Sequence, residues 1–258
     1  STAGTTMQSR AHIIALACGV ATFSGLAAAN LYIGSPGNPM TPSPRAVTVP
    51  VPTGAETHAE PPTSTVPPPA GPGLEPSFTT SVGGYRMALV LPGSFLMGSA
   101  GGEPGRDPDE QQHRVELTRP FYLGTTEVPQ QLWSELMGTN PSKFPGAQRP
   151  VEGVPWLDAV LFANRLSERD GLQPAYVVSG SRVSWDKAAA GYRLPTEAEW
   201  EFAARGGQSA LLYAGSSSIE PVGWYQANAG GSSQVVATKV PNALGLYDMT
   251  GNVWEWIW

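Results

Sequence analysis

The chain has 258 residues, a formal net charge of −6 at pH 7, 26 prolines and a single cysteine. No cluster of Lys and Arg stands against this acidic balance, so we expect no nucleic-acid partner, because such binding needs clustered cations to neutralise phosphates. The one cysteine, Cys18, lies near the N-terminus. The sequence therefore offers no intrachain disulfide and, beyond residue 18, no cysteine nucleophile or thiolate metal ligand.

After an N-terminal flank at residues 1–10, residues 11–33 form an apolar run, AHIIALACGVATFSGLAAANLYI. A run of about 20 residues is long enough to cross a bilayer as a helix. If translation starts at Met7 the run is a signal peptide, and if residues precede Ser1 it is a membrane anchor. Arg10 marks the inner side, so both readings predict a membrane-anchored or exported protein with an extracytoplasmic globular part. A lipoprotein signal ending at Cys18 fits less well, because the apolar stretch before it is too short. A buried core helix fits less well too, because the next segment offers no core.

Residues 34–82 are predicted to be a Pro-rich linker, because 13 of the prolines fall between Ser35 and Pro76. Such a composition favours an extended spacer without a core of its own. All eight tryptophans lie at Trp133 or later, so the packed domain is predicted at residues 83–258. That length is sufficient for one sizeable core.

The regular elements expected in this domain are short. Two strands are predicted around the Pro92-Gly93 turn, and HRVELTRPFYLG at 113–124 alternates as a strand. A helix is predicted from Pro129 to just before Gly138, and a second over about Leu157–Arg169, since both carry an apolar stripe at helical spacing. The remainder is rich in Gly, Ser and Pro. We therefore expect an α+β domain with few regular elements and much loop.

A third helix is predicted within GYRLPTEAEWEFAARGG at 191–207. Thr196 and Glu199 have the spacing of a reciprocal capping box, and Gly206 can end the helix in the left-handed conformation. Trp200 is expected to anchor the helix in the core. Three carboxylates lie along it: Glu197, Glu199 and Glu201. Acid–base chemistry is one interpretation, but a solvated face favoured by the helix dipole is preferred.

Several long motifs occur in one order along the chain: ALVLPGSFLMGS, TTEVPQQLWSELMGTNPSKF, VPWLDAVLFANRLSERDG, the helix segment just described, and GLYDMTGNVWEW. Together they resemble the formylglycine-generating enzyme (sulfatase-modifying factor) family, from about Tyr85 to Trp258. The resemblance implies an irregular, loop-rich α+β fold related to C-type lectins. It also implies copper- and oxygen-dependent oxidation of a cysteine in a newly made sulfatase to Cα-formylglycine.

The last motif places Asp248 and Glu255 seven positions apart around Gly251. Calcium takes ~6–8 oxygen ligands from carboxylates and backbone carbonyls, but this spacing alone is a weak signal. The resemblance implies a structural calcium site with side-chain ligands Asp248 and Glu255 and carbonyl ligands Gly251 and Val253. The alternative is that both carboxylates bond to nearby backbone amides. A second family calcium site is not predicted, because the segment after Asn228 lacks the matching aspartate.

The copper-binding cysteines of the family lie after the GNVWEW motif, so no catalytic residue is assigned here. Copper is expected only if a missing C-terminal segment supplies them, and we interpret the chain as an inactive fragment with the aromatic residues Trp254, Trp256 and Trp258 exposed. Three hypotheses remain: a sulfatase-modifying oxidase, a non-catalytic extracytoplasmic binding or scaffold domain for a protein or peptide, and an iron-dependent sulfur-transferring enzyme. The third is disfavoured because residues 83–258 contain one histidine, His113, interpreted as a surface or turn residue.

Overall fold

A computed structural model describes residues 11–13, 16–17, 74–103, 106, 108–207 and 211–258. Its main sheet has five strands in the order β10-β1-β7-β4-β3. The antiparallel part consists of β3 (Ser77–Thr79), β4 (Arg86–Val90) and β7 (Phe121–Gly124). Strand β1 (Ala11–Ile13) lies parallel to both β7 and β10 (Tyr192–Arg193). The sheet therefore combines a strand near the N-terminus with strands from residues 77–193.

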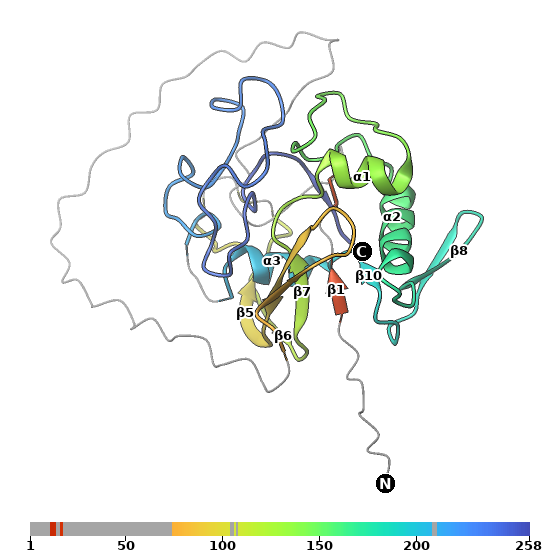
Figure 1. Cartoon of the computed structure of the whole chain (residues 1–258). Helices are drawn as coiled ribbons and strands as arrows, with labels where there is room; N and C mark the ends of the chain where they lie inside the picture. Colours follow the sequence, from red (N-terminus) through yellow and green to blue (C-terminus); the bar gives the residue numbers. More distant parts are fainter. Residues whose placement is uncertain (1–10, 14–15, 18–73, 104–105, 107, 208–210) are drawn as a thin grey trace, which may run out of the picture.

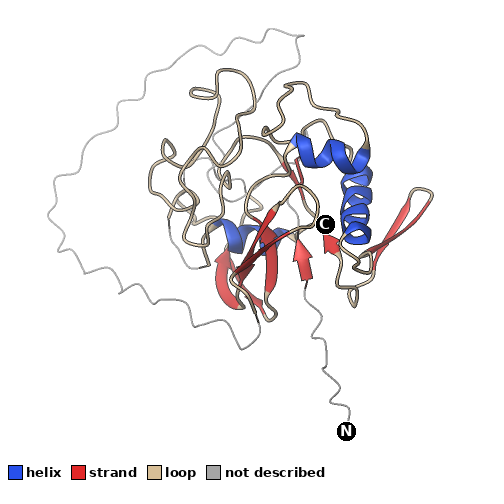
Figure 2. Cartoon of the chain, in the orientation of Figure 1, coloured by secondary structure: helices blue, strands red, loops and turns tan. Residues whose placement is uncertain are grey.

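Three two-stranded ribbons complete the strand set. They are β5 (Gly93–Met97) with β6 (His113–Leu117), β8 (Tyr176–Ser179) with β9 (Arg182–Trp185), and β2 (Leu16–Ala17) with β11 (Glu255–Trp256). Figure 1 shows the β8–β9 hairpin projecting from the body, and Figure 2 shows how much of the chain is loop. The loop-rich α+β expectation is confirmed.

The three predicted helices are present as α1 (Gln130–Met137), α2 (Trp156–Arg169) and α3 (Glu197–Ala204). Helix α1 follows Pro129 and ends at Gly138, which is left-handed with φ 74°. Helix α3 has the predicted capping box between Thr196 and Glu199, each side chain bonding the backbone N–H of the other residue. The residues at the ends of these two helices, such as Pro129, Gly138 and the Thr196–Glu199 pair, therefore determine where the helices start and end.

The buried side chains form two clusters. The first packs α1 and α2 together, with the rings of Trp133 and Phe162 stacked at 5.1 Å between centroids. The second joins β4, β7 and α3 to the C-terminal segment through residues such as Leu123, Phe202 and Leu246. Burying one such side chain contributes about 2 kcal/mol. The C-terminal loop is thereby fixed to the core next to α3.

The folded region begins earlier than predicted. Strand β3 starts at Ser77 and pairs with β4, and the ring of Phe78 meets that of Tyr122 edge-on at 4.9 Å between centroids. Residues 77–82, assigned to the linker, thus belong to the domain. A three-residue strand with one large apolar side chain does not stand out beside a Pro-rich segment. The flank 1–10 and linker residues 34–73 lie outside the described residues.

The apolar run at 11–33 was expected to be one helix. Its described residues, 11–13 and 16–17, instead form the strands β1 and β2. The prediction of a helix is therefore wrong at these positions. The physical reason is that unpaired backbone groups of β7 and β10 offer a place in the sheet. The rest of the run lies outside the described residues, and among the helices that the structure describes none is long and apolar enough to span a bilayer. Association with the membrane stays a prediction.

The C-terminal aromatic residues were expected to be exposed. Trp254 and Trp256 are half-buried, whereas Trp258 is 38% exposed. The ring of Trp258 stacks on Tyr176 at 4.9 Å, and the Trp256 indole N–H donates to the carbonyl of Val154 at 2.9 Å. The segment thus covers its own apolar surface against α2 and the β8–β9 hairpin, and the expected exposed patch is reduced to one ring.

Candidate functional site

Three carboxylates are buried around the C-terminal loop. Glu127 lies between β7 and α1, Asp248 lies in the loop, and Glu255 lies in β11; their residues are 1%, 3% and 4% exposed. Ionised groups are almost never buried to this degree unless they are paired with a charge or a metal. No ion pair to any of the three occurs among the described residues. Three acidic groups are therefore gathered here with no cation of the described residues paired to them.

The two predicted side-chain ligands, Asp248 and Glu255, are only partly satisfied by hydrogen bonds. Oδ2 of Asp248 accepts the Ala237 backbone N–H at 2.8 Å, and Oε2 of Glu255 accepts the indole N–H of Trp200 at 3.0 Å. Oδ1 of Asp248 is buried without a hydrogen-bond partner in the part of the chain that the structure describes. A buried, unpaired carboxylate oxygen is costly and is a ready ligand for a cation.

Glu127 is a residue that sequence reasoning missed. Its Oε2 accepts the Asn252 side-chain amide at 3.1 Å, and the Val253 backbone N–H also bonds the carboxylate. Its Oε1 is buried with no partner among the described residues. The available signal was a lone charge within FYLGTTEVP, between an apolar strand and a helix start. Only the tertiary fold brings it to the loop, since 125 residues separate Glu127 from Asn252.

Burial shifts the pKa values of all three carboxyls upward. It raises the pKa of Asp248 to about 6 despite the Ala237 hydrogen bond. It raises the pKa of Glu255 to about 7, with the charge of Asp248 adding to the effect. Burial and the two neighbouring carboxylates also hold the pKa of Glu127 well above its usual range. These shifts mean that the ionised form of each carboxyl is disfavoured at this site. A bound cation would favour the ionised form and lower the three pKa values.

The loop backbone is held in an unusual conformation. Asp248 and Asn252 have positive φ angles of 58° and 62°, and Gly251 has φ 101°. A Cβ at Gly251 would lie 2.1 Å from the carbonyl oxygen of Trp224, so no larger residue fits. Left-handed non-glycine residues are sparse and gather at functional sites. The fold thus fixes the backbone of the loop that carries Asp248 and precedes Glu255.

The donor set suits calcium better than copper. Among the described residues, no three His, Cys, Asp or Glu side chains are arranged to hold one metal ion. A calcium site here would need backbone carbonyls as well as carboxylates, as the family resemblance implies for Gly251 and Val253. A mixture of two carboxylates and carbonyls is a set that calcium accepts. Residues 74–258 contain no cysteine, so they do not fit a thiolate-bound copper. The side chain of Asn228 bonds the backbone of Tyr225 and Gly223.

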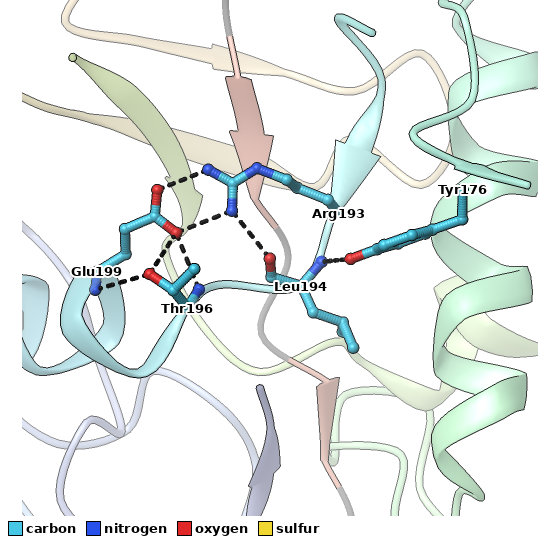
Figure 3. Close-up of polar contacts among 5 residues, drawn as sticks. All are labelled: Tyr176, Arg193, Leu194, Thr196 and Glu199. Atoms are coloured by element: carbon cyan, nitrogen blue, oxygen red, sulfur yellow. Dashed lines mark hydrogen bonds and ion pairs between the residues drawn. The ribbon is translucent and has the colours of Figure 1, made fainter. Parts of the chain in front are cut away.

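The carboxylates of α3 do not form the solvated face that was preferred. Only Glu197 is exposed. Figure 3 shows Glu199 held by both guanidinium nitrogens of Arg193, the closer contact being 2.6 Å. Glu201 is 4% exposed and pairs with Arg205 at 2.7 Å. Glu199 and Glu201 lie on different sides of the helix, and each is paired with its own arginine, so acid–base chemistry gains no support. His113 is exposed, as predicted.

Trp200 is half-buried rather than fully enclosed, and its indole N–H reaches Glu255 as described above. Helix α3 thus contributes apolar packing and also a hydrogen-bond donor to the acidic site, the cluster of Glu127, Asp248 and Glu255. This link joins the two segments that carry the strongest sequence motifs.

Comparisons with known proteins agree with this architecture. Residues 77–258 match the Sulfatase-modifying factor enzyme 1-like domain. The chain belongs to this family. The formylglycine-generating enzyme of Streptomyces coelicolor is 32% identical over 232 residues, which cover 72% of this chain and 71% of that enzyme. The Chaperone protein LppX of Paenibacillus barcinonensis is 38% identical over 172 residues, which cover 54% of this chain and 61% of LppX.

Among solved structures, Treponema denticola variable protein 1 superposes with a TM-score of 0.63 at 33% identity, covering 70% of this chain and 75% of that one. The family resemblance drawn from the sequence motifs is thereby confirmed, together with the fold. The chain spans 61% of LppX, so it corresponds to only part of that relative.

Proposed function

We propose that residues 77–258 form a calcium-stabilised domain of a formylglycine-generating enzyme, and that the complete protein oxidises a sulfatase cysteine to Cα-formylglycine. The observation that carries the proposal is the family match over the whole of this region, together with 32% identity to a formylglycine-generating enzyme across 72% of the chain. The C-terminal loop that carries Asp248 and leads to Glu255 lies within the matched region. Its buried oxygens without partners support the calcium component.

In this proposal Asp248 and Glu255 hold the ion with their carboxylates, and Gly251 and Val253 add carbonyl oxygens. Calcium supplies the positive charge that the buried acids lack, and Glu127 lies close enough for its charge to be offset as well. The ion is structural and takes no part in oxidation. The thiolates for copper come from outside residues 77–258, because this range contains no cysteine.

The same proposal places the domain outside the cytoplasm, tethered or exported through the apolar run at 11–33 and spaced from the membrane by the Pro-rich segment. A reporter fused after Pro76 in the complete gene tests this placement. Activity of a reporter that works only outside the cytoplasm supports it, and activity of one that works only in the cytoplasm contradicts it.

The oxidase proposal is tested with copper, oxygen and a peptide carrying Cys-x-Pro-x-Arg, the product being weighed by mass spectrometry. The complete protein is expected to convert the cysteine to formylglycine, and residues 1–258 alone are not. Conversion by residues 1–258 would contradict the assignment of the chemistry to another segment. Absence of conversion by the complete protein would favour the second candidate.

The second candidate is a non-catalytic binding or scaffold domain that takes an extracytoplasmic protein or peptide as partner. Two observations favour it: residues 77–258 have no cysteine, and LppX, a relative that is 38% identical, is named a chaperone. Fold and family leave this possibility open, because one scaffold can carry different sites. The gene sequence after Trp258 separates the candidates, since a pair of cysteines a few positions apart favours the oxidase.

A further inference from the structure

We propose that Arg149 and the loop at residues 229–234 form a binding site for a tetrahedral oxyanion, a sulfate or phosphate group. The sequence of this loop is AGGSSQ, and it is called the GGSS loop below. The inference goes beyond the proposed function and depends on neither calcium nor oxidation.

The GGSS loop is held closed by one side chain. Nε2 of Gln234 donates to the carbonyl of Ala229 at 2.7 Å and to the carbonyl of Ser232 at 3.1 Å. The backbone N–H of Gln234 donates to the side-chain oxygen of Asn252 at 2.8 Å, which fixes the loop to the C-terminal segment. The carbonyls of Ala229 and Ser232 therefore point toward the Gln234 amide, on the inner side of the loop.

This arrangement directs backbone donors outward. In a planar trans peptide, the carbonyl of one residue and the N–H of the next point in opposite directions. The N–H groups of Gly230 and Ser233 follow the two carbonyls bound by Gln234, so they point away from that amide. No acceptor for these two groups, or for the N–H of Gly231, occurs among the described residues. Three backbone donors are thus available to a ligand.

The two glycines give the loop its concave backbone. Gly230 and Gly231 have φ angles of 62° and 76°, whereas Ala229 and Ser232 on either side do not have positive φ. Such changes of handedness form backbone nests, whose N–H groups bind anions. A Cβ placed on either glycine would meet nothing within 4 Å. The glycines are therefore needed for the backbone conformation and not for packing, and the space beside them is open.

Arg149 brings a positive charge to the same loop. Its Nη1 lies 3.5 Å from Oγ of Ser232, at the long limit of a hydrogen bond. Its side chain passes over Gly146, where a Cβ would lie 2.8 Å from Cδ of the arginine. The backbone of Arg149 is fixed by bonds of 2.9 Å to the carbonyl of Gly146 and from the N–H of Gln130. The fold thus orients a half-buried guanidinium that no carboxylate of the described residues pairs with.

The mixture of donors favours a tetrahedral anion. Oγ of Ser232 accepts from both Arg149 and the Gln234 amide, so its own O–H can donate to a ligand. Oγ of Ser233 is buried without a partner among the described residues, so the loop holds one more unused donor. A guanidinium, a hydroxyl and backbone N–H groups approach from different directions. The four oxygens of sulfate or phosphate can accept from all of them, whereas the two oxygens of a carboxylate lie in one plane.

The test titrates the complete protein with sodium sulfate or sodium phosphate, with sodium chloride holding the ionic strength constant. Backbone amide NMR signals of Gly230, Gly231 and Ser233 should shift and saturate, while those of the β8–β9 hairpin stay in place. Acetate should bind about tenfold more weakly, because it can accept from fewer of the donors. This measurement uses the parent protein and does not depend on the folding of a variant.

Arg149→Met should weaken sulfate binding about tenfold, since it removes the charge but leaves the backbone bonds of residue 149. Arg149→Lys keeps the charge without the planar fork and should lie between the two. Arg182→Met, at an exposed position on β9, is the matched control and should bind as the parent does. Sulfate also stabilises proteins by exclusion from their surface, so the site is judged by saturation and by the difference between Arg149→Met and Arg182→Met.

Shifts that grow linearly without saturating would mean an adventitious ion only and would overturn the proposal. Equal binding by the parent and Arg149→Met would overturn it as well. Acetate binding as tightly as sulfate would overturn the tetrahedral assignment. The calcium melts and the oxidase assay do not bear on these outcomes, so the two proposals fail independently.

Discussion

Two buried acidic regions of this molecule carry the same kind of group and have opposite electrostatics. Glu199 at the start of α3 lies 2.6 Å from Arg193, and its oxygens also accept the backbone N–H of Thr196. Asp248 and Glu255 in the C-terminal loop face no described cation. Burial alone would raise the pKa of Glu199, but Arg193 and Thr196 together lower it, whereas burial raises the pKa of Asp248 to about 6 and of Glu255 to about 7.

The difference shows what completes a buried acidic site. The α3 region includes its cation in the fold, because Arg193 lies in β10, immediately before the capping box (Figure 3). Around the C-terminal loop, one oxygen each of Asp248 and Glu127 has no partner among the described residues, and the proposed calcium ion would supply the missing positive charge. The predictions below remove the protein cation from the first region or supply an ion to the second.

The largest effect is expected from Arg193→Met, which leaves the largely buried Glu199 without its cation. Breaking one side of a buried pair costs about 3–5 kcal/mol, so the free energy of unfolding at pH 7 should fall by about 3 kcal/mol. Urea denaturation followed by tryptophan fluorescence measures it. Arg182→Met, at an exposed position, is the matched control. Adding Glu199→Gln to Arg193→Met should restore part of the loss, and a loss equal to that of the control would show that the pair is dispensable.

Calcium is expected to stabilise the complete protein. An ion that binds only the native state at a hundred times its Kd raises the free energy of unfolding by about 2.7 kcal/mol. Thermal melts in calcium chloride and in EDTA measure the difference. Asp248→Ala should abolish it, whereas Glu168→Gln, which alters an exposed carboxylate on α2, should retain it. Equal melting temperatures with and without calcium would leave only the hydrogen-bonding role for Asp248 and Glu255.

The two regions should respond oppositely to pH when divalent cations are removed. The pKa values of Asp248 and Glu255 are raised in the folded state, so their contribution is complete below about pH 4 and is lost as pH rises through about 6 and 7. The pKa of Glu199 is lowered, so its contribution is present above about pH 4 and is lost as pH falls.

In EDTA, the free energy of unfolding should therefore decrease by roughly 4 kcal/mol between pH 5 and pH 8. Glu255→Gln removes one of the three carboxyls with a raised pKa and should reduce this decrease, and calcium should oppose the decrease in the parent. Urea titrations at half-unit pH intervals supply the measurement. A free energy that rises over this range would contradict the assigned direction of the shifts.

The smallest effect is expected from Thr196→Ala. The Thr196 hydroxyl accepts the Glu199 backbone N–H at 3.3 Å, and losing such a cap costs about 1 kcal/mol. Thr196→Ser keeps the hydroxyl and should cost only a few tenths. Chemical denaturation distinguishes the two variants. Equal stability of both would mean that the Arg193 pair alone holds this end of α3.

The sequence by itself determined the local features. The three helices, the capping box at Thr196, the strands flanking Pro92-Gly93 and the family membership follow from residues close together in the chain. Each depends on interactions over a few positions, such as a cap, a turn or an apolar stripe. The family resemblance of the last motif also pointed to Asp248 and Glu255 as a pair, because both lie within that one motif.

Only the tertiary structure decided the remainder. Glu127 joined the acidic site, Arg193 turned the expected solvated Glu199 into a buried pair, and residues 11–13 became a strand between β7 and β10. Each depends on partners far apart in sequence that the core brings together. Hydropathy measures how strongly a segment is driven out of water. Whether lipid or a β-sheet covers that segment depends on which backbone N–H and C=O groups the rest of the chain leaves without hydrogen-bond partners.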